Sequence, residues 1–419
     1  MKKSNLLFLS VLISWLFISL FSNYCYADNN PDIETLSPVA LLMDAKTGKV
    51  LYEKNGYEQN FHASTTKLMT AILTVENCKL TDVAKVSHNA VMSVPWDYTN
   101  AALQVDEELT IEELLNVLLI PSANDAGYVL AEHIAGSVES FSTMMNTKAI
   151  EIGCKGTNFT NPSGIHDDNH YSTAYDLALI GRYAMQYDII TNIASKTSYR
   201  LPATAKYPSD DRYFVTTNSM IRESFKNYYY EYATGLKTGY TEHALDCIVA
   251  TAKKDDMDLI VVILHAGYTP EGLRQKYLDC QTLFEYGFNN YSIKPIVNKN
   301  DVCTNVEIKG ATKETKNLNL LFKDDLSAFI SNTTSAEDIK PTITLKDDLI
   351  APITEGETLG KAEYIIEDIS YSVDLIAQSN VEAYSYVGLI FKILASVLIV
   401  AILLCLIKLI KPKKKKRKH

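Results

Sequence analysis

Ser64 and Lys67 are the pair of residues in this chain with the clearest capacity for chemistry. They lie in the stretch Ala63-Ser-Thr-Thr-Lys-Leu-Met-Thr70, after which apolar residues recur at helical spacing. This pattern places Ser64 at or just inside a helix start. Positions three apart share one helix face, so a hydroxyl and an amine meet at the positive end of the helix dipole, where an alkoxide is favoured. In isolation, however, such a pair is more often a capping serine beside a surface lysine.

Two later segments favour the chemical interpretation. Ser122-Ala-Asn124 breaks an amphipathic stretch, and Lys237-Thr-Gly239 heads an apolar run with the character of a strand. The three patterns S-x-x-K, S-x-N and K-T-G in this order are found together in serine enzymes that form acyl intermediates. The triple therefore indicates that Ser64 is a nucleophile and Lys67 its base.

Two other stretches have the same letters. Lys46-Thr-Gly48 precedes the serine and lies in a tight turn between two short apolar runs, and Ser87-His-Asn89 follows Lys67 without an intervening helix. We assign both to structure. His166 and His170 share a loop with two aspartates, but no third ligand stands at a telling spacing, so we expect loop hydrogen bonds there rather than a metal.

The two ends of the chain indicate export and anchoring. Residues 1–27 have the lysines, apolar core and small-residue exit of a cleaved signal peptide; the alternative is an uncleaved anchor. Residues 387–410 are almost wholly apolar and long enough to span a bilayer, with Lys392 near the outer end, where its stem can snorkel. The basic tail 411–419 predicts a cytoplasmic C-terminus and an extracellular body.

Charge excludes one class of partner. The formal net charge is −10, and the two apolar end segments with the tail hold eleven basic residues and no acidic one, which leaves about −21 on the exported body. Such a body is not suited to nucleic acid or to an anionic membrane face. Five cysteines fall in the body, none at a metal-ligand spacing, so one disulfide is possible but its pairing is open.

The expected elements describe an α+β domain followed by a smaller β-rich one. A hairpin over 38–55, helices over 110–120, 126–135, 144–153 and 175–187, a second hairpin over 247–264 and a helix over 271–287 predict a sheet assembled from both ends of the domain. We expect residues 197–227 to be mostly loop. We place the domains at 30–290 and 295–380, and expect the second to hold the first off the membrane.

The motifs and their context resemble the D-alanyl-D-alanine carboxypeptidases among the low-molecular-mass penicillin-binding proteins. The resemblance rests on residues 63–70, 122–126, Asn161-Pro-Ser-Gly164 and 237–241, and covers roughly residues 35–290; a weaker echo at Ala351-Pro352, Gly356 and Gly360 extends through the family's C-terminal β domain. Two features depart from the family. The C-terminal segment is expected to span the membrane, whereas the family's segment more often lies on the membrane surface. In addition, Ala123 occupies a position where the family commonly has glycine.

The resemblance implies a fold, a reaction and a set of roles. The fold is the β-lactamase/transpeptidase-like antiparallel sheet with a helical cluster, and the reaction removes the terminal D-alanine from peptidoglycan stem pentapeptides through an acyl-enzyme on Ser64, with β-lactams as inhibitors and no cofactor. Desolvation, the helix terminus and a second lysine would keep Lys67 neutral. The remaining implied residues are Lys237 with Ser122 as a proton relay, Asn124 on the substrate backbone, Thr238 with Gly239 at the terminal carboxylate, Arg274 as a charged partner for it, and the backbone of Ser64 and Tyr240 as the oxyanion hole.

Two alternatives remain open at this stage. A β-lactamase would need a deacylating glutamate in an E-x-x-x-N loop; Glu223 and Asn227 fit the letters, but they stand just before Lys237, and we interpret the match as chance. A penicillin-binding sensor or inactive scaffold would keep the fold without turnover. A sensor would need a cytoplasmic effector, whereas only the short basic tail follows the span.

Overall fold

The computed structural model of the chain describes residues 33–410. The predicted signal peptide and the basic tail lie outside these residues. Contacts within the chain divide it after Asn290 into two units, each described here by itself. The first unit carries the three motifs.

A five-stranded antiparallel sheet in the order β2-β1-β9-β8-β7 is the centre of the first unit. Its strands come from both ends of the unit, as predicted, because β1 pairs with β9 from Val39↔Leu264 to Asp44↔Leu259. The polar turn 253–258 joins β8 to β9, and β7 is an edge strand. The bounds are β1 Val39–Asp44, β2 Val50–Lys54, β7 Ala233–Thr241, β8 Leu245–Lys254 and β9 Met257–Ala266.

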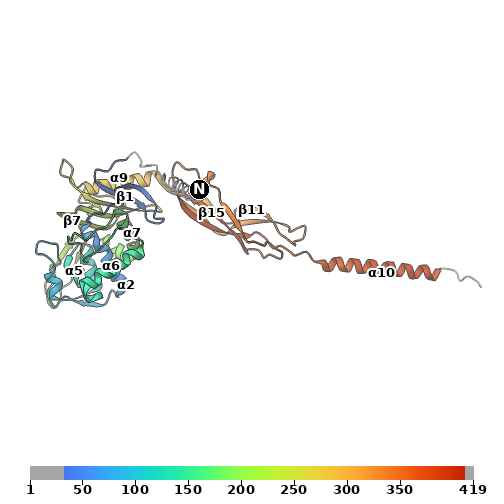
Figure 1. Cartoon of the computed structure of the whole chain (residues 1–419), viewed down its shortest axis with the longest axis horizontal. Coiled ribbons are helices and arrows are strands. Elements are labelled where there is room, and N and C mark those ends of the chain that lie inside the picture. The colour runs from blue at the N-terminus through green and yellow to red at the C-terminus, as the bar shows by residue number, and fades with distance from the viewer. Residues whose placement is uncertain (1–32, 411–419) are drawn as a thin grey trace, which may run out of the picture. The chain divides into compact units, whose positions relative to one another are not determined.

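Helices cover both faces of this sheet (Figure 1). Successive residues of a strand point to opposite faces. Gly287 of α9 (Gln275–Asn290) lies against Leu259, whereas Gly181 of α7 (Ala174–Ala184) lies against Ile260, so α9 and α7 pack on opposite faces. The main apolar core lies on the α7 side, where the other helices gather.

The helical cluster begins with the short 3-10 turn η1 (Ala63–Thr66), which continues directly into α2 (Lys67–Asn77). Thr110 and Glu113 form a capping box that starts α4. The other helices are α3 His88–Met92, α4 Ile111–Leu119, α5 Asn124–Ala135, α6 Val138–Ile152 and α8 Asp188–Ala194.

Two small two-stranded antiparallel sheets lie outside the main sheet. One is β3 (Val83–Lys85) with β4 (Glu108–Thr110). The other, β5 (Ser198–Arg200) with β6 (Tyr213–Val215), and the turn η2 (Ser219–Ile221) lie in the segment predicted to be mostly loop. That segment is polar and rich in tyrosine, so its strands carry little apolar alternation.

The second unit is β-rich, as expected, and has its own apolar core. A five-stranded sheet has the order β11-β12-β16-β15-β14, and β10 pairs with β13. The bounds are β10 Tyr291–Val297, β11 Val302–Glu307, β12 Asn317–Phe322, β13 Leu326–Ser331, η3 Ala336–Asp338, β14 Thr342–Leu345, β15 Thr358–Ile366 and β16 Ile369–Ala377.

The helix α10 (Tyr386–Ile410) follows the second sheet. Over Tyr386–Leu406 its mean hydropathy is 3.0, so in length and composition it can cross a membrane, and it is the one helix in residues 33–410 that can. An apolar helix with exposed side chains suits a lipid environment.

Candidate active site

Ser64 stands at the N-terminal end of the helix α2, on the turn η1. The side chain of Lys67 comes back along the same face, and its Nζ lies 2.8 Å from Ser64 Oγ. The residue before the serine, Ala63, has the left-handed φ of +48°. The local sequence therefore brings hydroxyl and amine together, in the way that the three-residue spacing predicts.

Lys67 is completely buried, and its Nζ forms two further hydrogen bonds. Its Nζ donates to Asn124 Oδ1 at 2.7 Å and to the Ser163 carbonyl oxygen at 2.6 Å. Burial lowers the pKa of Lys67 well below its ordinary range, and the nearby charge of Lys237 lowers it further, while Asp125 opposes them. Both effects favour the neutral amine, the form that can accept a proton.

Asn124 is oriented by the loop before it. Its backbone N–H and its side-chain Nδ2 both donate to the Thr99 carbonyl oxygen, at 2.9 and 2.8 Å. The amide oxygen therefore faces Lys67. Ser122 is buried in the turn between α4 and α5 with a φ of +71°. Both Ser122 and Lys237 are described, and no direct hydrogen bond joins them.

Strand β7 brings the third motif against the nucleophile. A Cβ on Gly239 would lie 2.9 Å from Ser64 N, so the strand approaches Ser64 as closely as glycine allows. Lys237 is 1% exposed and donates to the Thr238 carbonyl oxygen at 2.9 Å. Burial, followed by the charge of Lys276, lowers the pKa of Lys237 to about 7. Thr238 Oγ1 lies 2.6 Å from Thr217 Oγ1.

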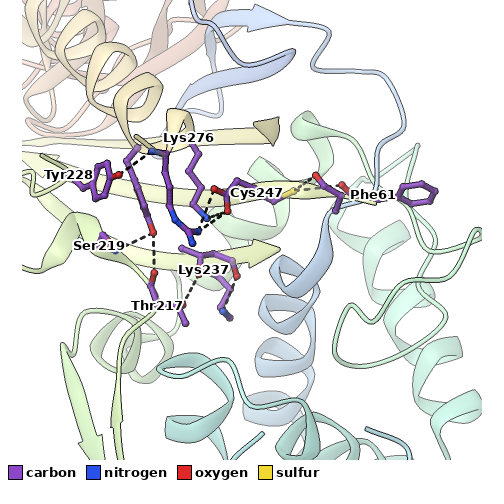
Figure 2. A network of polar contacts seen from close by, with 12 residues as sticks. Phe61, Thr217, Ser219, Tyr228, Lys237, Cys247 and Lys276 are labelled. Carbon is purple, nitrogen blue, oxygen red and sulfur yellow. Dashed lines mark hydrogen bonds and ion pairs between the residues drawn. The ribbon is translucent and has the colours of Figure 1, made fainter. Parts of the chain in front are cut away.

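A network of charged side chains lies beside β7 (Figure 2). Arg274 Nη1 donates to Asp246 Oδ1 at 3.0 Å, and Lys276 Nζ donates to the same oxygen at 2.8 Å. Asp246 lies opposite Tyr240 in the β7–β8 ladder. Arg274 is thus placed beside the third motif, and it shares the Asp246 carboxylate with Lys276.

The look-alike stretches are structural. Gly48 provides a φ of +80° in the β1–β2 turn, and Ser87 caps α3. Glu223 is exposed in the loop after η2. No cluster of potential metal ligands occurs in residues 33–410. The described cysteines are free thiols.

This fold with its serine–lysine pair defines the class of penicillin-binding serine enzymes. Residues 26–267 match the D-alanyl-D-alanine carboxypeptidase family, and residues 291–383 match the C-terminal domain of penicillin-binding protein 5. The chain belongs to the D-alanyl-D-alanine carboxypeptidase family and is a serine peptidase of peptidoglycan maturation.

Individual relatives support this membership. The carboxypeptidase DacF of Bacillus subtilis is 33% identical over 327 residues, which cover 77% of this chain and 79% of that protein. DacC of Escherichia coli is 27% identical over 364 residues, 83% of this chain and 85% of that protein. Both alignments extend well beyond the three motifs.

Solved structures share the fold. Penicillin-binding protein 5 of Haemophilus influenzae superposes with a TM-score of 0.64 at 24% identity. The superposition covers 84% of this chain and 99% of that protein. A mutant of the Streptomyces K15 DD-transpeptidase superposes with a TM-score of 0.56 at 27% identity, over 61% of this chain and 99% of that one. The predicted α+β domain followed by a β-rich domain is confirmed.

Proposed function

We propose that Ser64 is the acyl-ester nucleophile of this carboxypeptidase and that Lys67 is its general base. The observation that carries the proposal is the contact set of Lys67 Nζ. A neutral amine has two N–H groups and one lone pair. Because Asn124 Oδ1 and the Ser163 carbonyl oxygen only accept, they take the two N–H groups, and the lone pair faces the Ser64 hydroxyl.

Acylation then begins with the attack of Ser64 on the substrate, coupled to transfer of its proton to Lys67. Ser64 Oγ attacks the carbonyl carbon between the two terminal D-alanines while its proton moves to Lys67 Nζ. The developing oxyanion accepts hydrogen bonds from the backbone N–H groups of Ser64 and Tyr240, each worth roughly 3 kcal/mol at comparable sites. The close approach at Gly239 supports this arrangement, since β7 is an edge strand with N–H groups turned away from β8.

Departure of D-alanine requires a proton on its nitrogen, which Lys237 supplies through Ser122. Water later hydrolyses the ester: one proton of the water restores Lys237, and Lys67 returns its proton to Ser64 Oγ. The low pKa of Lys237 supports this role, because a group that titrates near pH 7 exchanges protons readily at neutral pH. Thr238 and Arg274 bind the terminal carboxylate of the substrate, and Asn124 binds its backbone.

We assign the other segments in the same way. Residues 1–27 are the signal peptide, 30–290 the catalytic domain, 295–380 the spacer domain and 387–410 the membrane anchor, with the basic tail in the cytoplasm and the catalytic domain on the cell-wall side. The apolar helix α10 supports the anchor. The positive-inside rule supports the orientation.

The decisive experiment compares the full chain with Ser64→Ala on a peptide ending in D-Ala-D-Ala. We expect D-alanine release by the wild type, none by the variant, and a penicillin adduct on Ser64 that persists for minutes. Release that survives in Ser64→Ala would overturn the assignment of the nucleophile. Loss of the adduct within seconds would indicate a β-lactamase, and an adduct without D-alanine release would indicate a scaffold.

A further inference from the structure

The turn that presents Ser64 needs support from outside itself. Ala63 has a left-handed φ, which a non-glycine residue adopts at a cost of strain. Its carbonyl oxygen is tightly enclosed, since a Cβ on Gly164 would lie 2.0 Å from it. The same oxygen accepts a hydrogen bond from Thr66 Oγ1 at 2.8 Å. Thr66 therefore closes the turn around Ser64.

His170 is the residue that directs Thr66. Its Nδ1 accepts the backbone N–H of Thr160 at 3.0 Å, and a backbone N–H can only donate. Nδ1 is therefore unprotonated, and the proton of the neutral ring is on Nε2. The Thr66 hydroxyl gives its one proton to Ala63, so its oxygen accepts from His170 Nε2 at 2.7 Å.

A second histidine covers the first. The ring of His62 stacks on that of His170 with centroids 4.9 Å apart. Thr65 Oγ1 donates to the His62 carbonyl oxygen at 2.7 Å, so His62 Nδ1 donates to Thr65 Oγ1 at 3.1 Å. The same Nδ1 lies 3.3 Å from Thr66 Oγ1, a longer contact than the one that His170 makes. Burial lowers the pKa of His62, and it lowers that of His170 to about 4. Both rings are thus neutral at physiological pH.

We propose that His170 is a positioning residue for acylation: its Nε2–H fixes the Thr66 hydroxyl, which holds the Ala63 carbonyl and so keeps Ser64 Oγ against Lys67 Nζ. Nothing in the motif set requires this histidine, because it stands far from Ser64 in the sequence and does not touch the reacting atoms. The proposal rests on the proposed role of Ser64 as nucleophile.

Two amide variants separate the two hydrogen bonds of the ring. In His170→Gln the side-chain amide reaches the place of Nε2 and can still donate to Thr66, whereas in His170→Asn it reaches only the place of Nδ1. Pre-steady-state acylation of the full chain by a fluorescent penicillin is the measurement. We expect His170→Asn to lower the acylation rate constant by about tenfold, the order of one lost hydrogen bond, with the dissociation constant of the preceding non-covalent complex unchanged. His170→Gln should stay within about threefold of the wild type.

Control variants separate the loss of this hydrogen bond from misfolding and from an error in the assigned nucleophile. His133→Asn alters an exposed histidine and should leave the rate unchanged. If His170→Asn does not fold, Thr66→Val against Thr66→Ser repeats the comparison, with loss in the first and retention in the second. Equal losses in the two amide variants, or a rate for His170→Asn within twofold of the wild type, would overturn the proposal. Peptide mass spectrometry locates the adduct: an adduct elsewhere than Ser64 would refute the proposed function instead.

Discussion

Buried lysines set the electrostatics of this site at the scale of single residues. Lys67, Lys237 and Lys276 are each at most 2% exposed. A buried ammonium is unfavourable unless it is paired, so each lysine either loses its proton or takes a carboxylate partner. Lys276 has such a partner in Asp246, while the pKa values of Lys67 and Lys237 are lowered. After burial, the nearby charge of Lys276 is the second cause of the lowered pKa of Lys237.

We predict that Lys276→Met moves the alkaline limb of kcat/KM for D-alanine release to higher pH. In the proposed mechanism Lys237 donates a proton in its charged form, and the charge of Lys276 is one cause of its pKa near 7. Without that charge the pKa of Lys237 rises, and the limb moves by on the order of one pH unit. Asp246 keeps Arg274 as a partner. The measurement is kcat/KM from pH 5 to 10.

The control for this variant is Lys253→Met, which removes an exposed charge from β8 and should leave the limb in place. An unchanged limb in Lys276→Met would contradict the prediction.

The lowered pKa of Lys237 also makes the stability of the fold depend on pH. Because the pKa of folded Lys237 lies below its ordinary 10.5, the unfolded chain binds more protons between about pH 7 and 10.5. This group's contribution to the free energy of unfolding therefore rises with pH across that window.

At the scale of elements, the site depends on how closely the loop 161–164 approaches the turn η1. Gly164 and Gly136 both have left-handed φ, +83° and +76°, but only at Gly164 would a Cβ collide with Ala63. We predict that Gly136→Ala costs roughly 1 kcal/mol of unfolding free energy with unchanged activity. Gly164→Ala should lower kcat by about 100-fold, because it displaces the Ser64 turn. D-alanine release and thermal unfolding test the pair, and equal activity in both variants would contradict it.

Much of this arrangement could be predicted from local sequence. Lys67 reaches Ser64 because both are on one helix face, and the β8–β9 hairpin follows from two apolar runs with a polar turn. By contrast, the sequence of β13 (Leu326–Ser331) shows no regular apolar alternation that would mark it as a strand. The predicted helix starts at 126, 144 and 271 differ from those of α5, α6 and α9 by a few residues, because caps and tertiary contacts set the ends of helices.

The residues that sequence reasoning missed act across long separations. The Ser163 carbonyl holds Lys67, and a backbone acceptor leaves no mark on residue type. Lys276 looks like an ordinary helix lysine until β8 places Asp246 beside it. His170 forms hydrogen bonds within its loop, as its sequence context predicts, but its contact with Thr66 joins residues 104 positions apart and depends on the fold.

At the scale of the whole molecule, the chain combines a catalytic unit, a β-rich unit and an apolar helix. Residues after Asn380 pair with the rest of the second unit. Val381 is buried and exchanges hydrogen bonds with Ile353 at 2.9 and 3.1 Å. Ala383 bridges to Ala311. The residues between β16 and α10 therefore belong to the fold of this unit.

We predict that a chain ended after Tyr384 is released from membranes and remains folded, because it lacks α10 but keeps these pairings. The full chain should stay in the membrane pellet through an alkaline carbonate wash, since an apolar helix of this length is held by the bilayer and not by charge.

A chain ended after Asn380 should also be released from membranes. Its second unit should lose about 2 kcal/mol or more of unfolding free energy, because it lacks one buried valine and the backbone hydrogen bonds of that residue. Fractionation and thermal unfolding of the three forms separate anchoring from folding. A carbonate-extractable full chain would contradict the anchor, and equal stability of the two shortened forms would contradict the boundary.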